Sequence, residues 1–598
     1  MNFFNRKTNL KIRHLLGSGW IYSPISYSVL IAISIVSGLL PALLISIQTK
    51  LIDQASLYSF GEIRAFAAVL LTFFLLNIID MNSQNLISYL NLKVCSKIET
   101  SVTTDFLTEM GKIRYEEYEN PVNQDVIYRI KSAIKPITQQ SVRFLANIMI
   151  YLIGLLGIFA YIIPTNTWWV IPISILLSLP SLHFNKKRVQ YARKVWQKNS
   201  FNVRYTDYLH KALVDRESAK ERKLFQFSDF LEEKWEKAFK KLNTDKISNY
   251  TKSSLATGIA MCFSMSNILI FGLALISPLQ KGEVTLGLYI SLMQMIITKF
   301  NFNLNSLIRE ITDLGEIKHF LQDVKLFVQC SYVVDSKTNR NISFESLEFD
   351  NVYFSYPGTD NLVLQGVSFK IEKGDHFALI GVNGAGKTTI TKLMLGLYTP
   401  TQGRILLNGV DLAEYSNREL QKIYVCMQQD AVNYKTTARE NIGLYRTETA
   451  FSDTELDAVL CSNHMLDLKE SFKGNYDTFL TPELENGVSM SGGQWQKISM
   501  ARTVFAKREF CILDEPTAPL DPLAEIEYYK HFSETMRENT VFYITHRLGS
   551  TFLFNKCLVL NNGVIEEIGS HEELMCKPSG TYKSLYTLQR EWYEKGGN

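Results

Sequence analysis

The sequence predicts an α-helical membrane domain with long cytosolic extensions, followed by a water-soluble α/β domain. Apolar stretches long enough to cross a bilayer recur up to about residue 310. Short apolar strands separated by Gly, Pro and Asn take over near Ile342. One of these strands runs into a glycine-rich turn and then a helix. We therefore expect a membrane domain, a linker and an α/β domain over residues 1–320, 321–341 and 342–598.

The first half contains stretches with the length and composition of membrane spans. A bilayer core about 30 Å thick needs about 20 apolar residues in a helix. We expect six spans, at about 23–48, 65–90, 144–163, 168–184, 255–277 and 284–307. The third and fourth are separated by the turn Pro164–Thr167. Buried helices of a soluble domain are a poor alternative, because stretches of this length do not recur so often in one.

Lys and Arg in the short connections are concentrated on one side of these spans. Arg13 and the run Lys186–Lys198 lie on that side, and the loops on the other side contain few basic residues. The positive-inside rule makes the basic side cytoplasmic. We therefore expect a multi-pass protein of the cell membrane whose two termini and α/β domain are cytoplasmic. The long charged segments 93–143 and 186–252 indicate helices that extend into the cytosol.

Two charged residues, Asp80 and Lys299, lie inside expected spans. Both are about 22 Å below the outer start of their helices at a rise of 1.5 Å per residue. Intramembrane charges usually face a cavity or each other, so one hypothesis places them in a substrate cavity, as a pair. The alternative places both at the inner interface, where a lysine can extend to water.

The composition argues against nucleic acid as a partner and against a disulfide framework or a zinc site. The net charge is +4, with 63 basic and 59 acidic residues, so no strongly basic face for nucleic acid is expected. The eight cysteines are scattered and form no CxxC pair, which argues against a disulfide framework or a zinc site.

The strand His376–Ile380 leads directly into GVNGAGKT, which occupies 381–388, and then into a helix. Glycine permits a turn whose backbone N–H groups surround phosphates, and the helix N-terminus adds partial positive charge. Lys387 is expected on the β- and γ-phosphates and Thr388 on Mg²⁺. A chance glycine-rich turn is the alternative. The candidate phosphate-binding residues are Gly381, Asn383, Gly384, Ala385, Gly386, Lys387, Thr388 and Thr389.

A second strand, Phe510–Leu513, ends in Asp514 and Glu515. An acid at the carboxyl end of a strand beside a phosphate loop can hold Mg²⁺, which assigns that role to Asp514. Glu515 is placed to orient or activate the attacking water. An ordinary solvated strand end is the alternative for a pair of acids taken alone.

Between these motifs, Ser491-Gly492-Gly493-Gln494 before a helix resembles the signature of ABC ATPases, with Met490 in place of the usual leucine. The resemblance implies ATP as the nucleotide and further roles for residues at matching positions. Tyr356 would stack on adenine, Gln429 would contact Mg²⁺ and water, and His546 would contact the γ-phosphate. Asp521 matches the family's aspartate in a loop that here reads Ala-Pro-Leu-Asp. Taken alone, Tyr356 could be a core tyrosine and His546 a structural histidine.

The resemblance extends over the chain to ABC exporter half-transporters of the type IV fold. In that family two chains form composite sites, so the phosphate loop of one would face Ser491 and Gly493 of the other. A homodimer is favoured, and a heterodimer with a defective partner remains open. Segments 114–125 and 217–225 resemble the first and second coupling helices, which connect the membrane and ATPase domains.

The segment Glu485–Arg502 resembles bacterial exporters of lanthipeptides and other ribosomal peptides. Only about 22 residues precede the first expected span, too few for the peptidase domain of about 150 residues that some peptide exporters carry. We therefore expect a precursor peptide exported with its leader attached. A multidrug or lipid exporter, moving a hydrophobic small molecule, is the alternative. A metal-chelate importer or an ATP-gated channel is less favoured.

Overall fold

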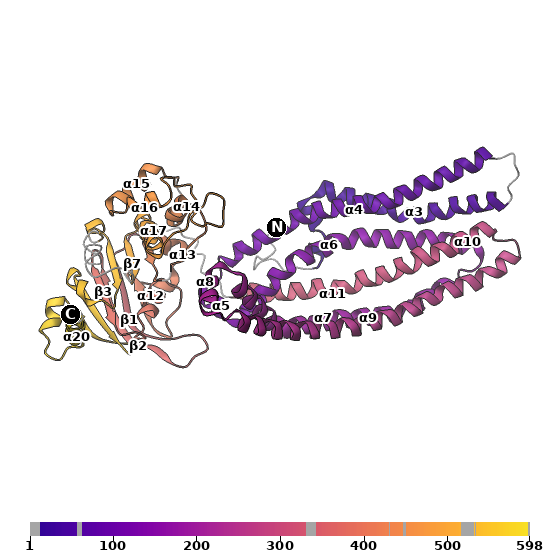
Figure 1. The fold of residues 1–598 in the computed structure, drawn as a ribbon. Coiled ribbons are helices and arrows are strands. Elements are labelled where there is room, and N and C mark those ends of the chain that lie inside the picture. Colours follow the sequence, from indigo (N-terminus) through magenta and orange to yellow (C-terminus); the bar gives the residue numbers. More distant parts are fainter. Residues whose placement is uncertain are drawn as a thin grey trace. The chain divides into compact units, whose positions relative to one another are not determined.

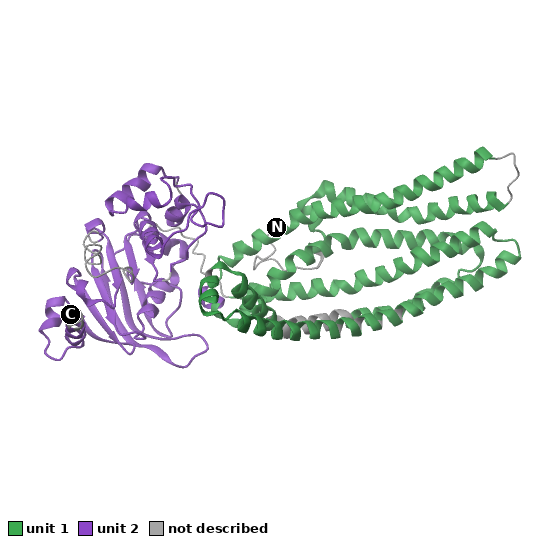
Figure 2. Ribbon diagram, in the orientation of Figure 1, with its two compact units in different colours: residues 1–113, 119–330 green, residues 114–118, 331–598 purple. Residues whose placement is uncertain are grey.

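A computed structural model describes residues 12–56, 63–330, 342–429, 431–446, 450–515, 532 and 534–595. The chain divides into two compact units (Figures 1 and 2). Unit 1 comprises Met1–Ile113 and Glu119–Cys330, and unit 2 comprises Arg114–Tyr118 and Ser331–Asn598. The division near residue 330 falls within the stretch where the sequence changes from apolar spans to short strands.

Unit 1 is built from helices, several of which are far longer than a bilayer is thick. α4 has 48 residues and α9 has 53, against about 20 for a span. The helices are α1 (Ile12–Leu16), α2 (Ser18–Tyr22), α3 (Pro24–Ser56), α4 (Ile63–Met110), α6 (Pro121–Ile162), η1 (Ile163–Thr165), α7 (Val170–Val214), α8 (Arg216–Phe225), α9 (Ser228–Gln280), α10 (Leu286–Met295), η2 (Ile296–Phe300) and α11 (Asn301–Gln329).

Local sequence explains where several of these helices begin. Asn120 caps α6 by accepting a hydrogen bond from the Val122 N–H at 3.0 Å, and Pro121 occupies the first turn, where its missing N–H costs nothing. Thr285 caps α10 through the N–H of Leu288. Between α10 and α11 the chain makes a π-helical turn, η2, which contains Lys299.

Among the described residues, four helices are long and apolar enough to cross a membrane: α3, α4, α6 with η1, and α9. The fourth expected span falls in α7, where Pro180 interrupts the apolar stretch and Lys186 soon follows. The sixth expected span is divided by η2 into α10 and α11. The count of six spans therefore stays a prediction.

In the part of unit 2 that the structure describes, the strands form two sheets. An antiparallel sheet has the order β2-β1-β4-β5, and a largely parallel sheet has the order β10-β9-β3-β8-β7-β6. The strands are β1 (Ser346–Ser355), β2 (Leu362–Glu372), β3 (His376–Gly381), β4 (Gln402–Leu407), β5 (Val410–Asp411), β6 (Tyr424–Met427), β7 (Phe510–Asp514), β8 (Thr540–Ile544), β9 (Lys556–Asn561) and β10 (Val564–Gly569).

Helices of unit 2 pack around these sheets (Figure 1). They are α12 (Lys387–Met394), η3 (Leu412–Glu414), α13 (Asn417–Ile423), α14 (Ala438–Gly443), η4 (Leu444–Arg446), α15 (Asp453–Ser462), α16 (Asp467–Ser471), α17 (Gly492–Phe505), η5 (Leu548–Leu553), α19 (His571–Cys576) and α20 (Thr581–Lys595). Arg114–Tyr118, which overlaps α5 (Tyr115–Glu119), also groups with unit 2. There the Glu116 carboxylate accepts from the Thr399 N–H at 2.9 Å.

Every residue of β3, β7 and β8 is buried, as expected for central parallel strands covered on both faces. Phe377 of β3 and Phe542 of β8 stack with ring centroids 6.1 Å apart in the core. Because parallel strands end at the same edge of a sheet, the loops after these three strands meet there. That edge carries the candidate site.

Candidate nucleotide site

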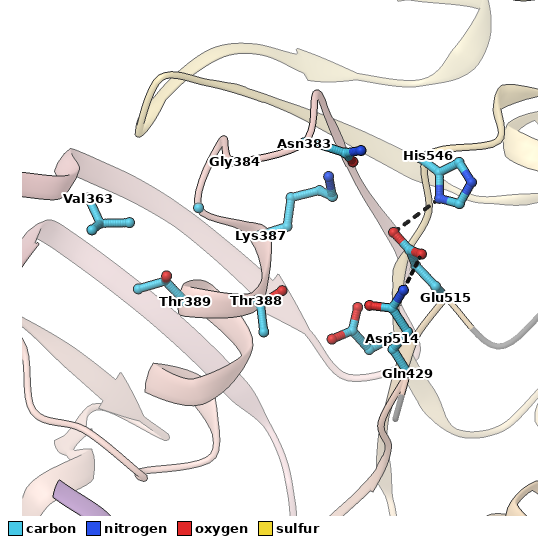
Figure 3. Close-up of a pocket in the computed structure, with 11 residues that line it drawn as sticks. Val363, Asn383, Gly384, Lys387, Thr388, Thr389, Gln429, Asp514, Glu515 and His546 are labelled. Carbon is cyan, nitrogen blue, oxygen red and sulfur yellow. Dashed lines mark hydrogen bonds and ion pairs between the residues drawn. The ribbon is translucent and has the colours of Figure 1, made fainter. Parts of the chain in front are cut away.

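A pocket of about 450 Å³ lies where β3, β7 and β8 end (Figure 3). It brings together side chains that the sequence places far apart, including those of the phosphate loop, Gln429, the acidic pair and His546. Its lining residues are Val363, Asn383, Gly384, Gly386, Lys387, Thr388, Thr389, Gln429, Asp514, Glu515 and His546.

The phosphate loop requires glycine at defined positions. Gly386 precedes α12 with φ +107°, and a Cβ there would lie 2.9 Å from Leu364 Cδ2. At Gly381, which ends β3, a Cβ would lie 2.3 Å from the Leu560 carbonyl oxygen. Any other residue would therefore push the loop away from the strand or strain its backbone. Gly381 and Ala385 do not line the pocket, and the Ala385 side chain is buried.

Lys387 begins α12 and is 7% exposed. Its ammonium group donates to the carbonyl oxygens of Gly381 at 2.9 Å and Val382 at 3.2 Å. Burial lowers the pKa of Lys387, and the nearby charges of Glu515 and Asp514 oppose that effect. Charged phosphate oxygens form stronger hydrogen bonds with an ammonium group than these neutral carbonyl oxygens do.

Glu515 has an unusual backbone conformation directly after β7. Its φ is +47°, in the left-handed region that costs a non-glycine residue free energy. Its N–H donates to the Ile544 carbonyl oxygen at 3.0 Å, which fixes the turn against β8. The strained turn directs the side chain into the pocket rather than along the strand.

Both oxygens of the Glu515 carboxylate have partners (Figure 3). Oε2 accepts from Gln429 Nε2 at 3.0 Å, and Oε1 lies 3.0 Å from His546 Nδ1. The Glu515 side chain is 13% exposed and that of His546 is 44% exposed. The residues predicted to act on water and on the γ-phosphate therefore contact one another directly.

Thr388, Asp514 and Gln429 line the same pocket and offer oxygen ligands, the kind that Mg²⁺ prefers. The described residues contain no group of three or more His, Cys, Asp or Glu able to hold a metal ion. This donor set fits Mg²⁺, which usually takes one or two protein oxygens together with phosphates and water.

Tyr356 lies beside the phosphate-loop helix. Its hydroxyl is 3.0 Å from Thr389 Oγ1, and its ring meets Tyr398 edge-on at 5.4 Å. Tyr356 is only partly buried.

Ser491 caps α17 and does not line the pocket. Its hydroxyl accepts from the Gln494 N–H at 3.3 Å, and Gln494 Oε1 accepts from the Ser491 N–H at 2.8 Å. Ser491, Gly492 and Gly493 are exposed, and a Cβ at either glycine would meet nothing within 4 Å. The first turn of α17, which carries the signature, is therefore exposed. Asp521, the other residue predicted near a nucleotide, lies outside the described residues.

In unit 1, Lys299 Nζ donates to Asp80 Oδ2 at 2.9 Å. The Lys299 side chain is 33% exposed and that of Asp80 is 20% exposed. The ion pair joins α4 to the π-helical turn η2. Whether a substrate cavity includes the pair stays a prediction.

Sequence reasoning missed Val363, which lines the pocket from β2. It belongs to no motif, and an apolar residue on a strand gives no signal of a ligand.

The comparisons with known proteins agree with this geometry. A family profile described as ABC transporter matches residues 364–518, a range that contains the phosphate loop, the signature and Glu515. The nisin transport ATP-binding protein NisT of Lactococcus lactis subsp. lactis is 27% identical over 566 residues, covering 93% of this chain and 92% of the relative. The subtilin transport ATP-binding protein SpaT of Bacillus subtilis is 27% identical over 565 residues, covering 93% and 90%.

Unit 2 of this chain contains an ABC transporter domain. A solved structure titled as a bacterial Atm1-family ABC exporter with ATP bound matches it with a TM-score of 0.81 at 21% identity, covering 94% of this chain and 98% of that one. The chain therefore has the exporter fold. Its ABC domain, together with the exporter relatives, implies ATP hydrolysis by a transporter, and the four long apolar helices agree with a multi-pass membrane protein. The expected ABC domain, exporter fold and ATPase activity are confirmed.

Proposed function

We propose that this ABC transporter exports a peptide from the cytoplasm across the cell membrane, as a homodimer with two composite ATP sites. The observation that carries the peptide assignment is the similarity to proteins named for nisin and subtilin transport, which extends over 93% of the chain. That length includes the membrane unit, where cargo is selected, as well as the ATPase unit.

Of the polar groups within the helices of unit 1, the ion pair of Asp80 and Lys299 supports a polar cargo. Besides the Asp80–Lys299 pair, the amide of Asn267 donates to Asn301 at 3.2 Å and that of Asn305 donates to Ser264 at 2.9 Å. Such groups are costly in an apolar membrane interior, so their presence favours a role in transport. Ser264, Asn267 and Asn301 are buried, so their hydrogen bonds join the helices to one another, whereas the Asp80–Lys299 pair is partly exposed and is available to a polar cargo.

The exposed signature supports the dimer. Ser491 and Gly493 lie outside the pocket that holds Lys387 and Glu515, so a signature that contacts nucleotide in such a pocket would be supplied by a second chain. A backbone N–H cluster at a helix start is a suitable partner for the γ-phosphate of a nucleotide held by the other copy. The bound phosphates would then join the two ATPase units.

In the proposed reaction, Lys387 and the loop amides bind the β- and γ-phosphates of ATP. Glu515 orients the attacking water and accepts its proton, while Gln429 and His546 hold the carboxylate. Thr388, Asp514 and Gln429 would hold Mg²⁺, which would neutralise charge on the phosphate oxygens. The ATPase unit and both chain termini face the cytoplasm, where ATP and the cargo are found.

Cargo-stimulated hydrolysis tests the assignment. The purified transporter in nanodiscs is given a leader-bearing lanthipeptide precursor, a hydrophobic drug or a lipid. Peptide export predicts a severalfold rise in phosphate release with the peptide alone. Stimulation only by the drug or the lipid would favour the multidrug or lipid exporter instead.

A further inference from the structure

The C-terminal helix α20 reaches the loop that carries His546. Gln589 of α20 uses both ends of its amide there. Its Nε2 donates to the His546 carbonyl oxygen at 3.1 Å, and its Oε1 accepts from the Leu548 N–H at 2.6 Å. One side chain thus holds the backbone on both sides of Arg547.

Thr545 makes further hydrogen bonds that hold the loop of residues 545–548. Thr545, buried at the end of β8, donates its N–H to Leu379 and uses its hydroxyl to accept from the Arg547 N–H at 3.0 Å. The His546 carbonyl and the Leu548 N–H, however, depend on Gln589. Because the imidazole is attached to this backbone, its 3.0 Å approach to Glu515 depends on where α20 holds the loop (Figure 3).

α20 itself is firmly anchored at its start. Tyr582, in its first turn, is completely buried. The Tyr582 hydroxyl lies 2.7 Å from Thr551 Oγ1 in η5 and 2.6 Å from His571 Nδ1 in α19. Because Thr551 follows His546 along the same loop, α20 contacts that loop at two points.

We propose that Gln589 is a positioning residue for His546, so that α20 belongs to the hydrolysis machinery. This inference rests on the proposed role of His546 in holding the Glu515 carboxylate. Gln589 does not enter the pocket and acts through the backbone of residues 546–548. Loss of its two hydrogen bonds lets the imidazole move away from Glu515 and leaves Lys387 and the phosphate loop in place.

The test compares Gln589→Met, which keeps the side-chain volume but removes both hydrogen bonds, with Thr587→Leu, an exposed control position on α20. The full-length transporter in nanodiscs is assayed for ATP hydrolysis and for thermal unfolding. We expect kcat to fall about tenfold in Gln589→Met, as for two lost hydrogen bonds, with KM for ATP within about twofold. Thr587→Leu keeps the original kcat.

A second variant and a double mutant separate positioning from general stability. Gln589→Glu keeps the acceptor for Leu548 but loses the donor to His546, so it also lowers kcat. In a His546→Ala background, single-turnover hydrolysis shows no further loss from Gln589→Met. Unchanged kcat in both Gln589 variants, or an additive loss in that background, would overturn the inference. If His546→Ala alone hydrolyses ATP normally, the proposed role of His546 fails instead.

Discussion

Replacing Glu515 by glutamine tests the proposed chemistry with the smallest change in shape. Both carboxylate oxygens are engaged at 3.0 Å, by Gln429 and by His546. The amide of Glu515→Gln has one acceptor oxygen instead of two, and it cannot accept a proton from water. The fold is preserved, because the turn is held by the backbone hydrogen bond from residue 515 to Ile544.

Loss of a positioned general base usually lowers a rate by about 10²–10⁴-fold, equivalent to about 3–5 kcal/mol of transition-state stabilisation. We expect a loss in this range for Glu515→Gln. ATP binding should be retained or strengthened, because the change removes one negative charge near Lys387 and the phosphates.

The assay measures phosphate release and ATP affinity of the full-length protein in nanodiscs, together with the distance between the two ATPase units. The variant should bind ATP and hold the units together without turnover. The matched control is Glu345→Gln, an exposed position at the start of the ATPase unit, which should hydrolyse at the original rate. Unchanged hydrolysis in Glu515→Gln would refute the assignment of Glu515.

Three further predictions follow from other features. Gly493→Ala should leave the midpoint of thermal unfolding unchanged, because a Cβ at this position meets nothing within 4 Å. If the nucleotide of a partner chain packs against Gly493, the same change should lower ATP hydrolysis more than tenfold. Normal hydrolysis would contradict the composite site. Asp80→Asn or Lys299→Met should each impair transport and cost about 1–3 kcal/mol of stability, because one charge of the pair is left without its partner. The double variant should recover part of the lost stability. Unimpaired transport in the single variants would refute the cavity hypothesis. Burial lowers the pKa of His376, so the unfolded chain takes up a proton before the folded chain does as the pH falls, and the stability of the fold should decrease below about pH 6.5. His376→Asn should weaken this pH dependence of thermal unfolding between about pH 5 and 8. Identical pH profiles for the variant and the original protein would contradict the prediction.

The parts of the site that follow local rules could be predicted from the sequence. The phosphate loop is encoded by glycine spacing between a strand and a helix, and Asp514 and Glu515 follow a buried strand. These patterns identify residue types and roles because the chemistry requires them within a few residues of one another.

Contacts between distant segments could not be predicted in this way. The left-handed φ of Glu515 depends on a hydrogen bond to Ile544, and Gln589 reaches His546 only after the chain has completed two more strands and α19. The pairing of Asp80 with Lys299 was one of two hypotheses, since periodicity gives depth in a helix but not the neighbour it faces. The π-helical turn η2 within the sixth expected span also left no signal in hydropathy.

The most direct test of peptide export is ATP-dependent uptake of a labelled lanthipeptide precursor into inside-out proteoliposomes, where the ATPase units face the added nucleotide. The account predicts uptake with ATP by the original protein and none by Glu515→Gln. Uptake should exceed that of a labelled lipid or hydrophobic drug under the same conditions. Peptide accumulation that is equal with and without ATP, or equal in Glu515→Gln, would contradict it.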